Sequence, residues 1–246
     1  MTGVQTCALP IYQVRTLAQR LNDLPRELNA VEAMARNIRL GGRDNARALS
    51  HLQEAYRLAA KLKKREDVGR FLNSMAIVEW ECQNYDNALC HYEEALTVYR
   101  DLGDDRKVGF ILNSIAVTLR SMSRFDEAIT ALDRALAIHR ETNERLHEGQ
   151  ALAVMGHLLA DRDQLSEAID TYRRSLTIRR EIGDSLGQGW VTYYIALIYV
   201  RQMQIQEGRS FVSQAHEIAS TYDDQELGQA CLKLEDKIAV IELTSL

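Results

Sequence analysis

Small and large apolar residues recur along this chain at a fixed interval of forty residues. A glycine opens the interval at Gly69, Gly109, Gly149 and Gly189, and mostly apolar residues stand three, six and ten places after each one. Such spacings place side chains on one face of a helix. A second group of small and apolar residues follows at helical spacing. Because a fixed period of this length is typical of stacked helical repeats, the pattern predicts an all-α chain, an α-solenoid of stacked antiparallel helix pairs.

Three positions in each interval carry small residues, and large residues stand between them. Small side chains let two helix backbones approach closely, and the large ones fill the space beside the contact. The alternation therefore predicts that the two helices of each pair interdigitate. The small residues are Ala76, Ala116, Gly156 and Ala196 at the first position, Ala88, Ala128, Ala168 and Gly208 at the second, and Ala95, Ala135, Ser175 and Ala215 at the third.

This order of large, small and aromatic positions resembles the tetratricopeptide repeat family. Residues 69–108, 109–148 and 149–188 match its pattern at nearly every position, and 189–227 matches it more loosely. The family's usual unit has about 34 residues, so each copy is longer here, and the proline near its end is absent. Extended repeats of this kind are similar to those of kinesin light chains, bacterial peptide-pheromone receptors and large signalling ATPases. The resemblance implies a right-handed superhelix.

Further segments adjoin these copies. An earlier copy over 28–68 fits with one extra residue, which we expect the loop at Gly41-Gly42 to absorb, so that the array spans 28–227. Residues 12–22 match the end of a second helix and are interpreted as the remnant of a truncated repeat. Residues 228–246 continue the apolar stripe of the last copy. We expect them to form a C-terminal capping helix with a polar outer face, as a helical stack needs to stay soluble.

The first eleven residues, MTGVQTCALPI, do not follow the repeat pattern. The string matches the in-frame translation of a common short-read sequencing adapter begun at a GTG codon. We therefore interpret Met1–Ile11 as a non-native segment and leave it out of the fold prediction. The alternative is a native N-terminal loop. On the first interpretation the natural protein extends upstream, because the join at Tyr12 falls inside a helix.

Charge and cysteine usage narrow the partners and the compartment. The chain has 246 residues and a formal net charge of −5, which argues against nucleic acid, since binding to phosphates needs lysine and arginine. Outside the first eleven residues, Cys82, Cys90 and Cys231 form no CxxC pair. Such a scattered, odd set is typical of reduced thiols in a cytoplasmic protein. The apolar run Val191–Val200 is too short to span a membrane, so no membrane partner is expected.

Motifs for catalysis or metal binding are not visible in the sequence. The six histidines are scattered without a zinc-binding spacing, and no nucleophile stands in a recognisable pairing with a base. His157 is interpreted as a polar lining residue of a groove and not as a metal ligand. We therefore predict that the chain is not an enzyme and needs no cofactor or metal.

In the tetratricopeptide family the first helix of each pair lines the concave face, so the resemblance implies a peptide-binding groove there. Aromatic residues and arginines stand at the inward positions, and both are enriched at binding hot spots. Arg36 and Arg39 of the earlier copy also fall inward and, with two arginines of later copies, suit an acidic peptide or a carboxylate. The candidate groove residues are Arg70, Asn73, Trp80, Phe110, Asn113, Arg120, His157, Trp190, Tyr193 and Tyr194.

Asn73 and Asn113 are the most specific of these candidates. The stretches LNSMA and LNSIA around them resemble the LNxLA stretch of peptide-binding members of the family, whose asparagine amide bonds the ligand backbone. An amide offers a donor and an acceptor together, so it can pair with a peptide of any sequence. The alternative is that each asparagine bonds a neighbouring helix and only shapes the superhelix.

The sequence thus predicts a non-catalytic scaffold that binds a protein or peptide, interpreted as the C-terminal module of a larger cytosolic regulator. The partner would be a peptide in the concave groove or another domain of the same parent protein. Two alternatives stay open. One is a sensor domain for a small peptide signal, and the other is the regulatory part of a signalling ATPase or nucleotide cyclase whose catalytic domain stands upstream.

Overall fold

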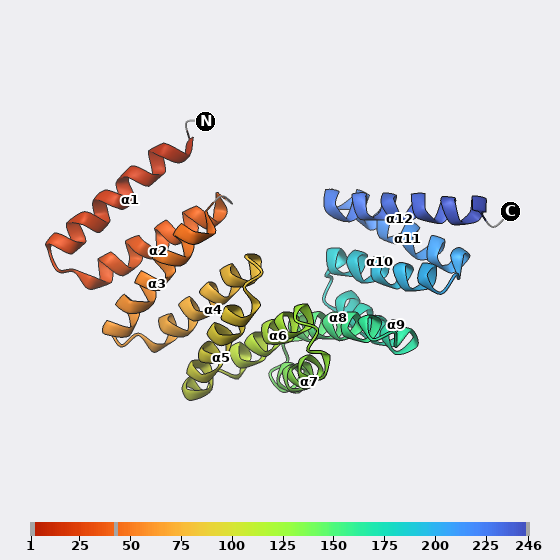
Figure 1. The fold of residues 1–246 in the computed structure, drawn as a ribbon, viewed down its shortest axis with the longest axis horizontal. Helices are drawn as coiled ribbons and strands as arrows, with labels where there is room; N and C mark the ends of the chain where they lie inside the picture. The colour runs from red at the N-terminus through yellow and green to blue at the C-terminus, as the bar shows by residue number, and fades with distance from the viewer. Residues whose placement is uncertain (1–2, 42–43, 245–246) are drawn as a thin grey trace. The chain divides into compact units, whose positions relative to one another are not determined.

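The chain is all-α in the computed structural model, which describes residues 3–41 and 44–244, with side chains from Ile11 onward (Figure 1). Over these ranges it forms twelve helices and no strand. The fold class predicted from the forty-residue period is therefore confirmed. The helices are α1 Gly3–Arg20, α2 Leu24–Leu40, α3 Asn45–Lys61, α4 Arg65–Glu81, α5 Tyr85–Leu102, α6 Asp105–Ser121, α7 Phe125–Glu141, α8 Arg145–Asp161, α9 Leu165–Glu181, α10 Ser185–Arg201, α11 Ile205–Thr221 and α12 Gln225–Thr244.

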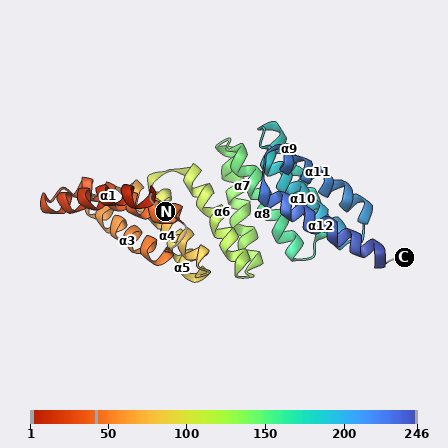
Figure 2. The ribbon, with the colours of Figure 1, turned by 90° about the horizontal axis from the view of Figure 1, so that it is seen from above.

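The helices group into two compact units. Unit 1 ends at Arg124 and holds α1 to α6, and unit 2 begins at Phe125 and holds α7 to α12. Within each unit every helix packs against the next one along the chain, and α10 also contacts α12. Figures 1 and 2 show α10, α11 and α12 side by side in unit 2. The division between the units falls inside the copy 109–148, between its two helices.

The turns between helices share one backbone device. From Lys63 onward a residue with positive φ stands in each turn at intervals of twenty residues, and among those described only Gly103 and Gly183 are glycine. In both turns the glycine is followed by aspartate, and this pair of residues suits the end of one helix and the start of the next. Asp104 and Asp184 each cap the next helix, since their carboxylates accept hydrogen bonds from the backbone N–H of Lys107 (3.1 Å) and Gly187 (2.9 Å). The remaining positions are Asn22, Lys63, Gln83, Ser123, Asn143, Asp163, Met203 and Asp223.

The irregular N-terminal copy differs from the others in one connection. Helix α2 ends at Leu40 and α3 begins at Asn45, so four residues connect them, whereas each of the other connections has two or three. Gly42, where an extra residue was expected, lies outside the described residues. Helix α1 begins at Gly3 and runs through Pro10. The first eleven residues are therefore helical from Gly3 onward and do not form a loop; their foreign origin stays a prediction.

The small residues of the repeat lie where the helices meet. Ala76, Ala116 and Ala196 are fully buried, as are the alanines at the other two small positions. Gly69 is required for a close approach, because an added Cβ would meet the Tyr99 ring at 2.9 Å. One buried position carries a charge. Glu79 is only 6% exposed and accepts a hydrogen bond from Asn84 Nδ2 at 2.8 Å, which satisfies one carboxylate oxygen.

Helix α12 completes the core of unit 2. Its residues Leu227, Cys231, Leu234 and Ile238 are buried in a cluster with residues of α10 and α11. Burial, and to a lesser degree the negative charge of Glu235, raises the pKa of the Cys231 thiol to about 11. The stripe that predicted a last packed helix therefore forms one.

Candidate functional site

The ten candidate residues all lie on the first helices of pairs, and the two units divide them. Unit 1 holds Arg70, Asn73 and Trp80 on α4 and Phe110, Asn113 and Arg120 on α6; unit 2 holds His157 on α8 and Trp190, Tyr193 and Tyr194 on α10. That they form one groove stays a prediction.

Asn73 and Asn113 share an unusual environment in unit 1. Each side chain is half-buried, and each Oδ1 is buried yet accepts no hydrogen bond from any residue that the structure describes. Exchanging O and N within the amide would leave an unpaired donor there instead. A buried polar atom without a partner costs about 1–3 kcal/mol. The hydrogen bond to a neighbouring helix that the structural alternative requires is not formed by these oxygens.

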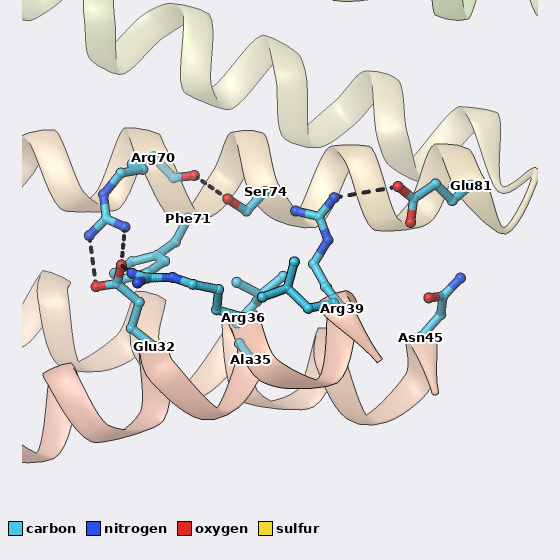
Figure 3. Close-up of a pocket in the computed structure, with 11 residues that line it drawn as sticks. Glu32, Ala35, Arg36, Arg39, Asn45, Arg70, Phe71, Ser74 and Glu81 are labelled. Carbon is cyan, nitrogen blue, oxygen red and sulfur yellow. Dashed lines mark hydrogen bonds and ion pairs between the residues drawn. The ribbon is translucent and has the colours of Figure 1, made fainter. Parts of the chain in front are cut away.

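A cavity of about 640 Å³ lies between α2, α3 and α4 in unit 1. Its charged lining residues come from α2 and α4, and they face one another in pairs across the gap (Figure 3). Three arginines that the sequence placed at inward positions line it, namely Arg36, Arg39 and Arg70. The charged residues are Glu32, Arg36, Arg39, Arg70 and Glu81.

Arg70 is held rigidly at one end of this cavity. Its guanidinium donates to both carboxylate oxygens of Glu32 (2.7 and 3.1 Å) and to Asp67 (2.8 Å), and it stacks over the Phe71 ring at 4.5 Å. The hydrogen bonds to Glu32 raise the pKa of Arg70, and those bonds in turn lower the pKa of Glu32. Arg70 therefore links α4 to α2 through its ion pair with Glu32.

The remaining candidates of unit 1 lie at its partly exposed surface. Trp80 is 36% exposed and lies 6.5 Å from the Tyr85 ring, centroid to centroid, and Phe110 is 38% exposed. Arg120 stands in the last turn of α6. Behind this face Tyr92 is buried, and burial raises its pKa to about 12 although Ser114 bonds its hydroxyl.

In unit 2 the structure brings all four candidates into one aromatic cluster. The Tyr194 ring lies 6.1 Å from Trp190, 5.6 Å from Tyr193 and 4.3 Å from His157, centroid to centroid. A fifth residue joins them: the hydroxyl of the buried Tyr172 hydrogen-bonds His157 Nδ1 at 2.7 Å. Edge-to-face contacts of this kind favour a fixed ring arrangement.

Gly156 explains how Tyr172 reaches this cluster. The other copies carry alanine at this place, but a Cβ on Gly156 would meet the Tyr172 ring at 2.5 Å. The missing methyl group lets the ring lie against α8, so its hydroxyl meets His157. Tyr172 was not among the candidate groove residues. The glycine in an alanine position was the signal that a larger neighbour enters there.

A second polar network in unit 2 was missed from the sequence. Arg179 is 8% exposed, donates from Nε to Ser175 Oγ at 3.2 Å and forms an ion pair with Asp184. Ser175 Oγ donates to the Gly149 carbonyl at 2.7 Å. A Cβ added at Gly187 would collide with the Arg179 guanidinium, so only glycine fits at this position. The available signal was serine at a position otherwise held by alanine.

Two kinds of feature are absent from the part of the chain that the structure describes. Residues 3–41 and 44–244 contain no group of three histidine, cysteine, aspartate or glutamate residues placed to hold a metal ion. None of the described helices is long and apolar enough to cross a membrane.

Comparison with known proteins identifies the repeat. Residues 107–181 match the family model described as tetratricopeptide repeat. Over these residues the chain carries tetratricopeptide repeats. The tetratricopeptide repeat is generally a non-enzymatic scaffold fold. A search of curated proteins finds no significant match.

Solved structures that are similar to this chain include the following three. BtubC (BKLC) from P. vanneervenii has a TM-score of 0.76 and 19% identity, over 91% of this chain and 93% of that one. The Rap conjugation gene regulator of plasmid pLS20, in complex with the Phr* peptide, has a TM-score of 0.70 and 14% identity, over 85% of this chain and 58% of that one. The STAND protein with a tetratricopeptide repeat sensor from Pyrococcus horikoshii has a TM-score of 0.63 and 18% identity, over 98% of this chain and 38% of that one. At these identities the likeness concerns the fold.

Proposed function

We propose that this chain is a non-catalytic scaffold that binds a peptide, or an extended segment of a partner protein, on the inner faces of its first helices. The observation that supports this most is the unpaired, buried amide oxygen of Asn73 and of Asn113. Two equivalent positions in successive copies carry the same unsatisfied group. A ligand that bonds both amides would remove the same energetic penalty twice.

The surroundings of the two asparagines leave the amides as the groups that read the ligand. The adjacent hydroxyls are occupied, since Ser74 donates to the Arg70 carbonyl at 3.0 Å and Ser114 to the Phe110 carbonyl at 3.3 Å. The terminal torsion of asparagine is broad, so a small rotation turns the oxygen toward the inner face. The amide can then accept from a peptide N–H while donating to a peptide carbonyl.

A peptide partner also agrees with the charge and with the structural neighbours. A net charge of −5 disfavours nucleic acid, and we infer a cytoplasmic protein from its unpaired cysteines. The similar Rap regulator is in complex with a peptide. A second candidate is a sensor domain whose peptide is a signal, which the sensor role of the repeats in the similar STAND protein favours.

The test is the double variant Asn73→Ala with Asn113→Ala, assayed against peptides selected from a random library on the unaltered chain. Binding should be abolished, because each lost amide pair costs about 1 kcal/mol or more. Helicity should stay nearly unchanged and the melting temperature should not fall, because the oxygens bond nothing in the free protein. Isothermal titration calorimetry measures the binding affinity and thermal unfolding measures the melting temperature, both on one preparation.

A matched control is Asn87→Ala, which removes an exposed asparagine from a second helix, α5. It should leave binding unchanged. If the double variant instead melts early and binding falls only in proportion, the asparagines are structural and the proposed role is wrong. Normal binding by the double variant would reject it as well.

A further inference from the structure

We propose that the cavity between α2, α3 and α4 accepts a ligand carboxylate on Arg39, and that Glu81 is an internal competitor for this arginine. Insofar as the ligand is a peptide, this rests on the proposed function. The residues concerned are separate from the asparagine pair.

The cavity has the size and lining of a site for a single side chain or small ligand. Its volume of about 640 Å³ falls in the range of small-molecule pockets. Ala35, Leu52 and Phe71 give it an apolar wall, and Ser74 adds a hydroxyl group. Figure 3 shows the guanidinium groups of Arg36, Arg39 and Arg70 between the two helices.

The three arginines of the cavity are bound to very different degrees. Arg70 makes three short hydrogen bonds to Glu32 and Asp67. Arg36 Nη2 bonds Glu32 at 2.9 Å. Arg39 makes one long contact, from Nη2 to Glu81 Oε1 at 3.4 Å, and the two side chains are 33% and 41% exposed. An exposed pair with this geometry contributes little to stability. Arg39 is therefore the arginine at which a ligand carboxylate can replace the internal partner.

Glu81 thus stands where a ligand carboxylate would bind. A ligand that reaches Arg39 must displace Glu81 and then tolerate its negative charge nearby. The exchange replaces one carboxylate by another and gains little unless the ligand bonds the guanidinium with both oxygens, which makes shorter and stronger contacts. Removal of the Glu81 charge should therefore strengthen the binding of acidic ligands, although it removes a polar group from the site.

The probes are three octapeptides: acetyl-(Ala-Asp)4-amide, its uncharged counterpart acetyl-(Ala-Asn)4-amide, and acetyl-(Ala)8 with a free C-terminal carboxylate. For the aspartate peptide, Glu81→Gln should raise the affinity about three- to tenfold, since it removes a competing surface ion pair and a like charge. Arg39→Ala should lower that affinity about tenfold or more, because a charge-assisted pair is lost. The uncharged peptide should respond to neither. A response of the third peptide alone would assign the site to chain-terminal carboxylates instead of side chains.

The matched control is Glu66→Gln, which makes the same chemical change at the other end of α4, where Glu66 bonds Lys107 at 2.9 Å. It should leave the affinity for the aspartate peptide unchanged. The proposal is overturned if Glu81→Gln leaves the affinity unchanged or lowers it, if Glu66→Gln raises it equally, or if no variant binds either carboxylate peptide. Failure here, with loss of library-peptide binding in the double asparagine variant, would reject the role of Glu81 alone. The reverse outcome would reject the asparagine role alone.

Discussion

Helices α4 and α10 occupy the same place in their repeats, yet they present opposite chemistry on one face. Where α4 carries Arg70, Asn73 and Ser74, α10 carries aromatic rings 120 residues further on: Trp190, Tyr193 and Tyr194. Their packed faces are alike, since Met75 and Ala76 are buried as Ile195 and Ala196 are. The repeat fixes the packed face and leaves the other face free. Fold and ligand preference are therefore separable on a single helix.

The two Gly-Asp turns offer the strongest test of how far equivalent positions differ. Asp184→Ala should lower the free energy of unfolding by about 3 kcal/mol, because it removes a helix cap and leaves the buried Arg179 without its carboxylate. Asp104→Ala, eighty residues earlier, should lower the free energy of unfolding by only about 1 kcal/mol, since Asp104 caps α6 and pairs with the half-exposed Lys107. Urea unfolding measures both. Equal losses would mean that the Arg179 network adds nothing.

The position thirty residues after the opening glycine of a repeat also varies, with Tyr99, His139 and Arg179 in successive copies. His139 is fully buried, neither ring nitrogen has a described partner, and its ring stacks on His147 at 5.4 Å. Burial, and to a lesser degree His147, lowers the pKa of His139 to about 4, against opposing effects of Glu144 and Glu148.

The unfolded state therefore takes up a proton on His139 first as the pH falls. This contribution to stability is complete above pH 6.5 and declines as the pH falls toward 4, with about 2 kcal/mol lost between pH 8 and pH 5. His139→Leu should remove that part of the pH dependence, leaving the slope due to other groups. Unfolding free energies of both proteins at pH 8 and pH 5 measure the difference. An unchanged slope would show that the histidine is hydrated in solution.

Two glycines of unit 2 should respond to alanine with opposite signs. Gly156→Ala should destabilise by about 1 kcal/mol, because displacing the Tyr172 ring outweighs the better helix propensity of alanine. The same change at Gly228 should stabilise by about 0.5–1 kcal/mol, since the nearest atom to its added Cβ, in Ala219, lies 3.9 Å away. Thermal unfolding compares them. Stabilisation at both sites would show that Tyr172 moves without penalty.

The smallest expected effect concerns neighbouring turns with unlike residues. Met203→Gly should stabilise by about 0.5 kcal/mol, because an L-residue with φ 59° is strained where glycine is not. Gly183→Ala should destabilise by a similar amount or more, since its φ is 72°. If both changes are neutral, the turns relax and the left-handed positions impose no strain.

Much of the fold could be predicted from the sequence because it follows from local periodicity. The forty-residue interval, the small residues and the Gly-Asp turns are visible in the chain itself. The sequence also placed His157 and Tyr194 on the same kind of face, but it did not predict their ring contact or the hydrogen bond between His157 and Tyr172. It named Arg70 as a ligand group, whereas the structure ties Arg70 to Glu32. Such pairings depend on side-chain direction across helices, which spacing alone does not give.

The connection between Leu40 and Asn45 also has a consequence for how such a chain tolerates insertions and deletions. One residue added inside a helix would turn every later side chain of that helix by about 100°, and its inner face would become a packed face. Added in a turn, the same residue leaves the next helix in phase, as Ala48 and Ala55 on α3 show by their complete burial. A residue inserted or deleted in a turn therefore changes the length of that repeat only, because the helices that follow keep their packed faces.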